Sequence, residues 1–198
     1  MLVGVIDSGI GGLNIIKKVL EENKNDQFIY LSDTLFFPYG KKTKEELFLR
    51  VSFLIEELLR IGVKKIILAC NTISALIYED LKRKYQVPIV DMISMFSKYF
   101  KDNNIQKITL LGSEALINSQ VYQKIFIENN IEYEEIAVQE LIRRIEHNLD
   151  IKDELERLKE IIDKDTEIIL LACTHLIKIT PEIKDIFNKK VLSQIDIM

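Results

Sequence analysis

The chain has 198 residues, of which 47% are apolar and 29% charged, and its net charge is −4. This is the composition of a globular protein, long enough for one large domain or two small ones. The acidic balance and the lack of a basic stripe argue against nucleic acid as a partner. No apolar stretch could span a bilayer and no signal peptide opens the chain, so we expect no membrane partner and a cytoplasmic location.

The first half of the chain alternates strand patterns with helix patterns. Strands are expected at residues 2–7, 27–32, 65–69 and 87–91, and helices at about 13–22, 43–61 and 73–85. A glycine turn, Gly9-Ile10-Gly11-Gly12, follows the first strand. Thr43 and Glu46 have the spacing of a capping box, and Gly62 is placed to end the same helix.

The second half repeats this alternation. Strands are expected at residues 107–111, 132–137, 167–171 and 191–195, and helices at 114–129, 139–147, 152–162 and from Thr180-Pro181 onward. Strands alternating with helices indicate parallel sheets with right-handed crossovers. We therefore expect an α/β protein of two similar small domains, 1–92 and 93–198, with a boundary near residues 91–105.

The two cysteines of the chain lie in near-copies of one phrase. Ile66-Ile67-Leu68-Ala69-Cys70-Asn71-Thr72 corresponds to Ile169-Leu170-Leu171-Ala172-Cys173-Thr174-His175, and Ser8 and Ser113 are repeated at nearly the same separation. Each phrase reads as a buried strand that ends in a thiol. Because ligands of open α/β sheets bind at the carboxyl ends of strands, the pattern predicts a duplicated fold with a site in the cleft between its domains.

A pair of thiols could act as acid and base. Free cysteine has a pKa near 8.5, and the positive N-terminus of a helix lowers the pKa of a thiol beside it. The alternative for either cysteine alone is a buried structural residue. The spacing of Cys70 and Cys173 does not fit a disulfide framework or a structural zinc site, so both thiols are expected to be reduced and no metal is expected.

Polar residues near the thiols have two interpretations each. Asp7 and Ser8 end the first strand, where they could tune a thiol or cap the next helix. His175 could tune the Cys173 thiol in the same way, or it could be an ordinary structural residue. The glycine turn resembles a dinucleotide fingerprint, but Asn14 replaces its third glycine, so we favour backbone N–H groups that face a small carboxylate.

Four motifs occur together in this chain: Asp7-Ser8-Gly9-Ile10-Gly11-Gly12-Leu13, Pro38-Tyr39-Gly40, Cys70-Asn71-Thr72 and Cys173-Thr174-His175. In this order they resemble the glutamate racemases, within the aspartate/glutamate racemase family. The resemblance implies two α/β domains with the amino acid between them, and racemisation without a cofactor. It also implies a role in supplying D-glutamate for peptidoglycan, and it leaves a homodimer open.

Carried over by position, the resemblance makes Cys70 and Cys173 the two bases, supported by Asp7 and His175 respectively. It assigns substrate binding to nine further residues: Ser8, Pro38, Tyr39, Gly40, Asn71, Thr72, Ser113, Thr174 and Glu140. Leu116 and Leu176-Ile177 depart from the family's threonine and Tyr-Pro. The chain ends at Met198, where family members continue through another helix, so a shortened second domain is expected. The alternatives are a racemase of aspartate or another small acid, and a non-catalytic ligand-binding derivative.

Overall fold

A computed structural model describes the backbone of residues 1–198 and every side chain except that of Glu22. Its first sheet is parallel, with the strand order β2-β1-β3-β4. Its strands are β1 (Leu2–Asp7), β2 (Gln27–Ser32), β3 (Lys65–Leu68) and β4 (Ile89–Asp91).

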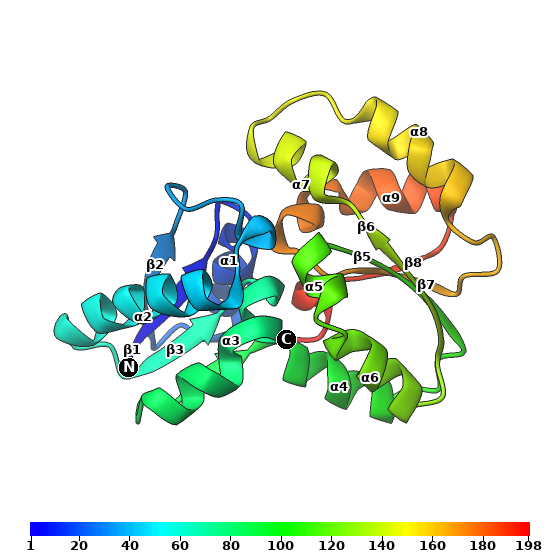
Figure 1. Cartoon of the computed structure of the whole chain (residues 1–198). Coiled ribbons are helices and arrows are strands. Elements are labelled where there is room, and N and C mark those ends of the chain that lie inside the picture. The colour runs from blue at the N-terminus through cyan, green and yellow to red at the C-terminus, as the bar shows by residue number, and fades with distance from the viewer.

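The second sheet is also parallel and has the equivalent order, β6-β5-β7-β8. Its strands are β5 (Lys107–Gly112), β6 (Glu132–Ala137), β7 (Ile168–Leu171) and β8 (Lys190–Leu192). The two sheets form the two lobes of the molecule (Figure 1). The predicted duplication is therefore confirmed, since β5 to β8 repeat β1 to β4 in both order and direction.

Helices cover both faces of each sheet. They are α1 (Leu13–Glu22), α2 (Lys44–Arg60), α3 (Asn71–Lys84), α4 (Met92–Asp102), α5 (Glu114–Asn118), α6 (Val121–Glu128), α7 (Gln139–Glu146), α8 (Lys152–Ile161) and α9 (Thr180–Phe187), with the 3-10 helices η1 (Tyr39–Lys41), η2 (Thr174–Ile179) and η3 (Gln194–Asp196). Alternate strand residues point to opposite layers. Ile66 and Leu68 of β3 pack with α2 and α3, whereas Ile67 packs with α1.

Helix α2 is formed as its sequence predicts. The Thr43 hydroxyl accepts the Glu46 N–H, and the Glu46 carboxylate accepts the Thr43 N–H, which satisfies backbone donors that the first turn leaves unpaired. Leu47, Val51, Ile55 and other apolar residues at this spacing are buried. Past the helix, Gly62 has a φ of 94°, in the left-handed region that glycine adopts at low cost.

Three segments differ from the sequence expectation. Residues 92–102 form α4, because the Asp91 carboxylate accepts the N–H groups of Ile93 and Ser94 and starts a helix. The helix expected at 114–129 is two helices, separated by Gln120, whose φ is 58°. The final strand ends at Leu192, before η3.

Each half contributes the segment after its fourth strand to the other half. Helix α4 follows β4, yet Phe96 and Phe100 pack with α6 against the second sheet. Ile195 and Met198 follow β8, yet they pack against the cluster on the first sheet. The red end of the chain accordingly lies between the lobes in Figure 1. The domain boundary at residues 92 and 93 stays a prediction.

Within the part of the chain that is described, none of the helices combines the length and the apolar character needed to cross a membrane.

Candidate active site

The carboxyl ends of equivalent strands meet at the junction of the two sheets. Asp7 ends β1 and Ser8 follows it, and Cys70 follows β3. Ser113 and Cys173 occupy the positions after β5 and β7 that match Ser8 and Cys70. Asp7 and Ser8 are buried, and Cys70 has only 6% of its surface exposed. Thus the topology gathers side chains that are far apart in the sequence at one buried edge.

The Asp7 carboxylate joins the two halves. Its Oδ2 accepts the N–H groups of Gly12 at 3.0 Å and Gly9 at 3.4 Å, and the Thr174 hydroxyl donates to Oδ1 at 3.2 Å. Burial raises the pKa of Asp7, while His175 and these hydrogen bonds oppose the shift without cancelling it. Asp7 therefore acts both as the anchor of the glycine turn and as a carboxyl group close to His175.

The glycine turn is packed against the second half and has no room for side chains. A Cβ at Gly11 would lie 2.6 Å from the backbone nitrogen of His175, and one at Gly9 would lie 2.7 Å from the Glu146 carboxylate. The Ile10 N–H donates to Glu146 Oε2 at 3.1 Å. The turn does present N–H groups to carboxylates, as expected, but those carboxylates are the protein's own Asp7 and Glu146.

Cys70 is the N-cap residue of α3, so its thiol lies at the positive end of a helix. Burial nevertheless raises its pKa to about 12, with further contributions from the charges of Asp7 and Cys173, although the N–H groups of Thr72 and Ile73 act in the opposite direction. The lowered pKa expected from the sequence is thus not found. In this arrangement Cys70 holds its proton at neutral pH.

Cys173 is half-buried and is followed directly by η2, a 3-10 helix. Its Sγ lies 3.6 Å from His175 Nδ1, and His175 Nε2 lies 2.6 Å from Glu146 Oε2. Burial lowers the pKa of His175, but the contacts with Cys173 and Glu146 outweigh burial and raise it to about 10. The thiol, imidazole and carboxylate form one chain, in which the imidazole is positively charged near neutral pH.

Further hydrogen bonds cross between the halves beside the thiols. Thr72 Oγ1 lies 2.9 Å from Ser113 Oγ, and the Tyr122 hydroxyl donates to Asn71 Oδ1 at 2.8 Å. Asn71 Nδ2 is buried and has no hydrogen-bond partner in the described structure. A buried donor without an acceptor is costly, so this amide is suited to receive a ligand's oxygen atom.

The loop carrying Pro38, Tyr39 and Gly40 reaches the junction from the first half. The Tyr39 hydroxyl donates to Asp33 Oδ2 at 2.8 Å, and Arg50 makes two hydrogen bonds to the same carboxylate. A Cβ at Gly40 would lie 2.8 Å from Ser113 Cβ, so the loop contacts the second half directly. This loop also lines a cavity of about 230 Å³ between the halves, with the lining residues Pro38, Lys41, Glu114, Gln139, Glu140 and Arg143.

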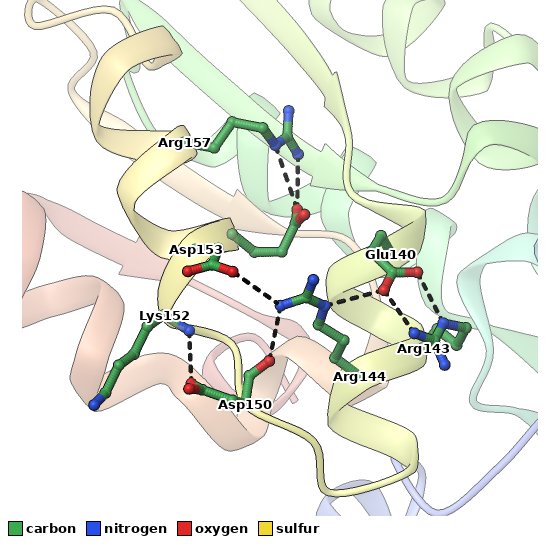
Figure 2. Close-up of polar contacts among 8 residues, drawn as sticks. Glu140, Arg143, Arg144, Asp150, Lys152, Asp153 and Arg157 are labelled. Carbon is green, nitrogen blue, oxygen red and sulfur yellow. Dashed lines mark hydrogen bonds and ion pairs between the residues drawn. The ribbon is translucent and has the colours of Figure 1, made fainter.

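Glu140 lies beside Pro38 in the lining of this cavity, but its side chain bonds only to residues outside the predicted site. Its carboxylate accepts hydrogen bonds from Arg143 and Arg144, on the surface where α7 faces α8 (Figure 2). These contacts lower its pKa to about 2. The acidic residue of this helix that contacts His175 is Glu146, at the helix end. We therefore favour Glu146 as the acidic residue of the site, and the predicted substrate-binding role of Glu140 stays a prediction.

Sequence reasoning also missed Tyr122 and Asp33, which hold Asn71 and Tyr39 by the hydrogen bonds described above. Asp33 directly follows β2 at the carboxyl edge of the sheet, which is a signal that could have found it, whereas Tyr122 lies within an apolar helix and has none. Within the described side chains, no group of three or more His, Cys, Asp or Glu residues is placed to hold a metal ion.

Comparisons with known proteins agree with this geometry. Residues 3–198 match the model of the family described as Asp/Glu/Hydantoin racemase. The glutamate racemase of Carboxydothermus hydrogenoformans is 31% identical over 195 residues, covering 94% of this chain and 72% of that protein.

Two solved glutamate racemases have the same fold. The structure from Campylobacter jejuni subsp. jejuni has a TM-score of 0.89 at 26% identity, covering 99% of this chain and 82% of that one. The structure from Francisella tularensis subsp. tularensis, in complex with D-glutamate, has a TM-score of 0.86 at 28% identity, covering 98% of this chain and 75% of that one. The resemblance indicated by the motifs is confirmed, and the chain belongs to the Asp/Glu/Hydantoin racemase family.

Proposed function

We propose that this protein interconverts L- and D-glutamate by proton transfer at the α-carbon, with Cys70 and Cys173 as the two bases. The observation that carries the proposal is the placement of the two thiols after β3 and β7, equivalent strands of a duplicated fold. Two bases on opposite faces of an α-carbon can invert it without moving the substrate. The glutamate racemases named above support glutamate as the substrate.

The protonation of the two thiols gives a starting state. We propose that Cys173 begins as a thiolate, because the charged imidazole of His175 lies 3.6 Å from its sulfur. Cys70 begins as a thiol, as its raised pKa of about 12 requires. The Cys173 thiolate takes the α-proton, the electron pair stays on the substrate, and Cys70 gives its proton to the opposite face.

The reverse enantiomer is converted by the same two groups in exchanged roles. Each turnover consumes one thiolate and produces the other, so the net charge of the site does not change. The carbanion-like intermediate is stabilised by fixed hydrogen-bond donors. We propose Asn71 Nδ2 as one such donor, because it is buried and unpaired. Ser8, Thr72, Thr174 and the Pro38-Tyr39-Gly40 loop complete the proposed substrate site.

The proposal is tested by incubating the purified protein with single enantiomers of glutamate and aspartate, followed by chiral chromatography. Racemisation of glutamate is the expected result. Preferred conversion of aspartate would favour the related small-acid racemase, and no conversion of any acid would favour a ligand-binding derivative. Activity that survives chelators and carbonyl-trapping reagents is expected, because the proposed chemistry requires neither a metal nor a pyridoxal cofactor.

Replacement of either thiol tests the two-base assignment. Cys70→Ser and Cys173→Ser are each expected to abolish racemisation while leaving the circular dichroism spectrum unchanged, because a hydroxyl is too weak an acid to exchange roles. In deuterated water, the inverted product is expected to carry deuterium at the α-carbon. Normal turnover by either variant, or product that keeps its original proton, would contradict the assignment.

Two further expectations concern the state of the protein. A cytoplasmic location is proposed because both thiols are free and must stay reduced for the chemistry. A homodimer stays a prediction, which light scattering of the purified protein tests directly.

A further inference from the structure

The amide of Asn71 is held from the opposite half of the molecule. Asn71 opens α3 in the first half, directly after Cys70, while Tyr122 lies on α6 in the second half. Both side chains are buried, with 1% of their surface exposed, and the Tyr122 hydroxyl donates to Asn71 Oδ1 at 2.8 Å. This is the only hydrogen bond of the Tyr122 hydroxyl in the described structure.

The direction of this hydrogen bond determines which end of the amide is free. A buried O–H that finds no acceptor is destabilising, so the Tyr122 hydroxyl is held as the donor. Burial, with the nearby charge of Asp91, also raises the pKa of Tyr122, which keeps it protonated. The Asn71 carbonyl oxygen is thereby engaged, and its NH2 group is left without a partner.

We infer that Tyr122 is a positioning residue, which orients the Asn71 amide so that its NH2 group is available to a carboxylate oxygen of the substrate. A carboxylate accepts such donors, whereas an amide rotated by half a turn would present an oxygen and repel it. The inference rests on the proposed function and extends it to a residue that touches no substrate.

The same hydrogen bond links ligand binding to the contact between the halves. It exists only while α6 and α3 are together, so the correct amide orientation requires the halves to be closed. A ligand that uses the oriented amide favours the closed arrangement by its difference in affinity for the two states. Thr72 and Ser113 form a second polar contact across the same junction, 2.9 Å long.

The test is the Tyr122→Phe variant, which removes the hydroxyl and keeps the ring. Its matched control is Tyr133→Phe, because Tyr122 and Tyr133 both pack on Phe126, at centroid distances of 5.9 and 5.4 Å. The Kd of D- and L-glutamate is measured by calorimetry, and kcat and KM by chiral chromatography. Loss of one hydrogen bond predicts a three- to tenfold rise in Kd and KM for Tyr122→Phe, which corresponds to about 0.6–1.4 kcal/mol. For Tyr133→Phe we expect no change, and for Tyr122→Phe we expect kcat within about threefold of the parent.

A double-mutant cycle tests whether Tyr122 acts through Asn71. In an Asn71→Ala background, Tyr122→Phe is expected to have no further effect on Kd and no longer to lower thermal stability, because the hydroxyl that it removes has already lost its only partner. An unchanged Kd in the single variant, or an additive effect in the double variant, would overturn the inference. If the parent binds glutamate without racemising it, only the proposed function is refuted. The Kd of the parent can then still be compared with that of Tyr122→Phe, which tests the role of Tyr122. A parent that binds none of the acids would overturn both.

Discussion

Glu146 and His175 are joined by a contact of 2.6 Å between Oε2 and Nε2, with only 7% and 1% of their side chains exposed. The Glu146 carboxylate holds the imidazole on the side away from Cys173. The carboxylate and the Cys173 thiol together raise the pKa of His175. Glu146 also accepts the Ile10 N–H, which ties this chain of groups to the glycine turn of the first half.

Glu146→Gln is therefore expected to reduce racemisation by at least about tenfold, because an amide keeps the hydrogen bonds but loses the negative charge that stabilises imidazolium. The loss is expected to differ between the D-to-L and L-to-D directions in kcat and in KM. The ratio kcat/KM must fall equally both ways, since the equilibrium constant stays at unity. Glu140→Gln is the matched control on the same helix, and its constants are expected to equal those of the parent. A larger loss of racemisation in Glu140→Gln than in Glu146→Gln would instead support Glu140 as the acidic residue of the site.

The pKa of His175 also predicts how stability depends on pH. Its folded-state pKa of about 10 lies above the unfolded value near 6.5, so the folded protein keeps a proton that the unfolded chain loses. The stabilisation is complete below about pH 6.5 and is lost as the pH rises towards 10. The free energy of unfolding in urea is expected to decline between pH 6.5 and 8.5 by about 1–3 kcal/mol, at 1.36 kcal/mol per pKa unit.

Glu146→Gln should reduce this fall in the free energy of unfolding with pH, because His175 then lacks the carboxylate that raises its pKa. The window below about pH 8.5 is chosen because the Cys70 thiol contributes a change of the same sign only at higher pH. Equal slopes for the parent and Glu146→Gln would show that the ion pair does not control the titration of His175.

The two thiols are expected to differ in reactivity. Cys70 is 6% exposed and has a pKa raised to about 12, whereas Cys173 is half-buried beside a charged imidazole. Because the thiolate is the nucleophile, iodoacetamide near pH 8 should alkylate Cys173 at least about ten times faster than Cys70. Peptide mass spectrometry over time measures both rates, and the difference should vanish in concentrated urea. Faster alkylation of Cys70 in the folded protein would contradict the assignment of Cys70 as the initial acid.

The duplicated fold could be predicted because its signal is local and repeated. An apolar strand followed by a thiol and polar residues has one favourable place in a parallel sheet, so the phrases around Cys70 and Cys173 locate one edge of both sheets. Even α4 carries a readable pattern, with Asp91 as its N-cap and Phe96 and Phe100 at helical spacing. Treating residues 91–105 only as a boundary overlooks that pattern.

The remaining features depend on packing between the halves, which leaves no local signal. Glu146 is one of several charged residues on α7, and only the approach of α7 to η2 directs it at His175. The raised pKa of Cys70 has the same origin, since a helix end is visible in the sequence but the burial that outweighs it is not. The need for glycine at Gly11 likewise depends on packing between the halves, because η2 lies directly against the turn.

A pair of glycine substitutions tests that last point. Gly11 lies where the halves touch, and an alanine Cβ there would be 2.6 Å from both His175 N and Thr174 Oγ1. Gly62 lies past the end of α2, where a Cβ would meet no atom within 4 Å, although its φ of 94° is strained for alanine.

Gly62→Ala is expected to cost about 1 kcal/mol of stability, from backbone strain alone, and to leave racemisation unchanged. Gly11→Ala must push the turn away from η2, because one of the two close atoms is backbone and cannot rotate aside. It should cost about 1–3 kcal/mol of stability and lower kcat/KM by about a hundredfold, since it displaces His175 from Cys173 and Thr174 from Asp7. Urea unfolding and chiral chromatography on both variants measure the two effects separately. If Gly11→Ala lost only as much activity as Gly62→Ala, the close packing of the turn on η2 would not be what positions His175 against Cys173 and Thr174 against Asp7.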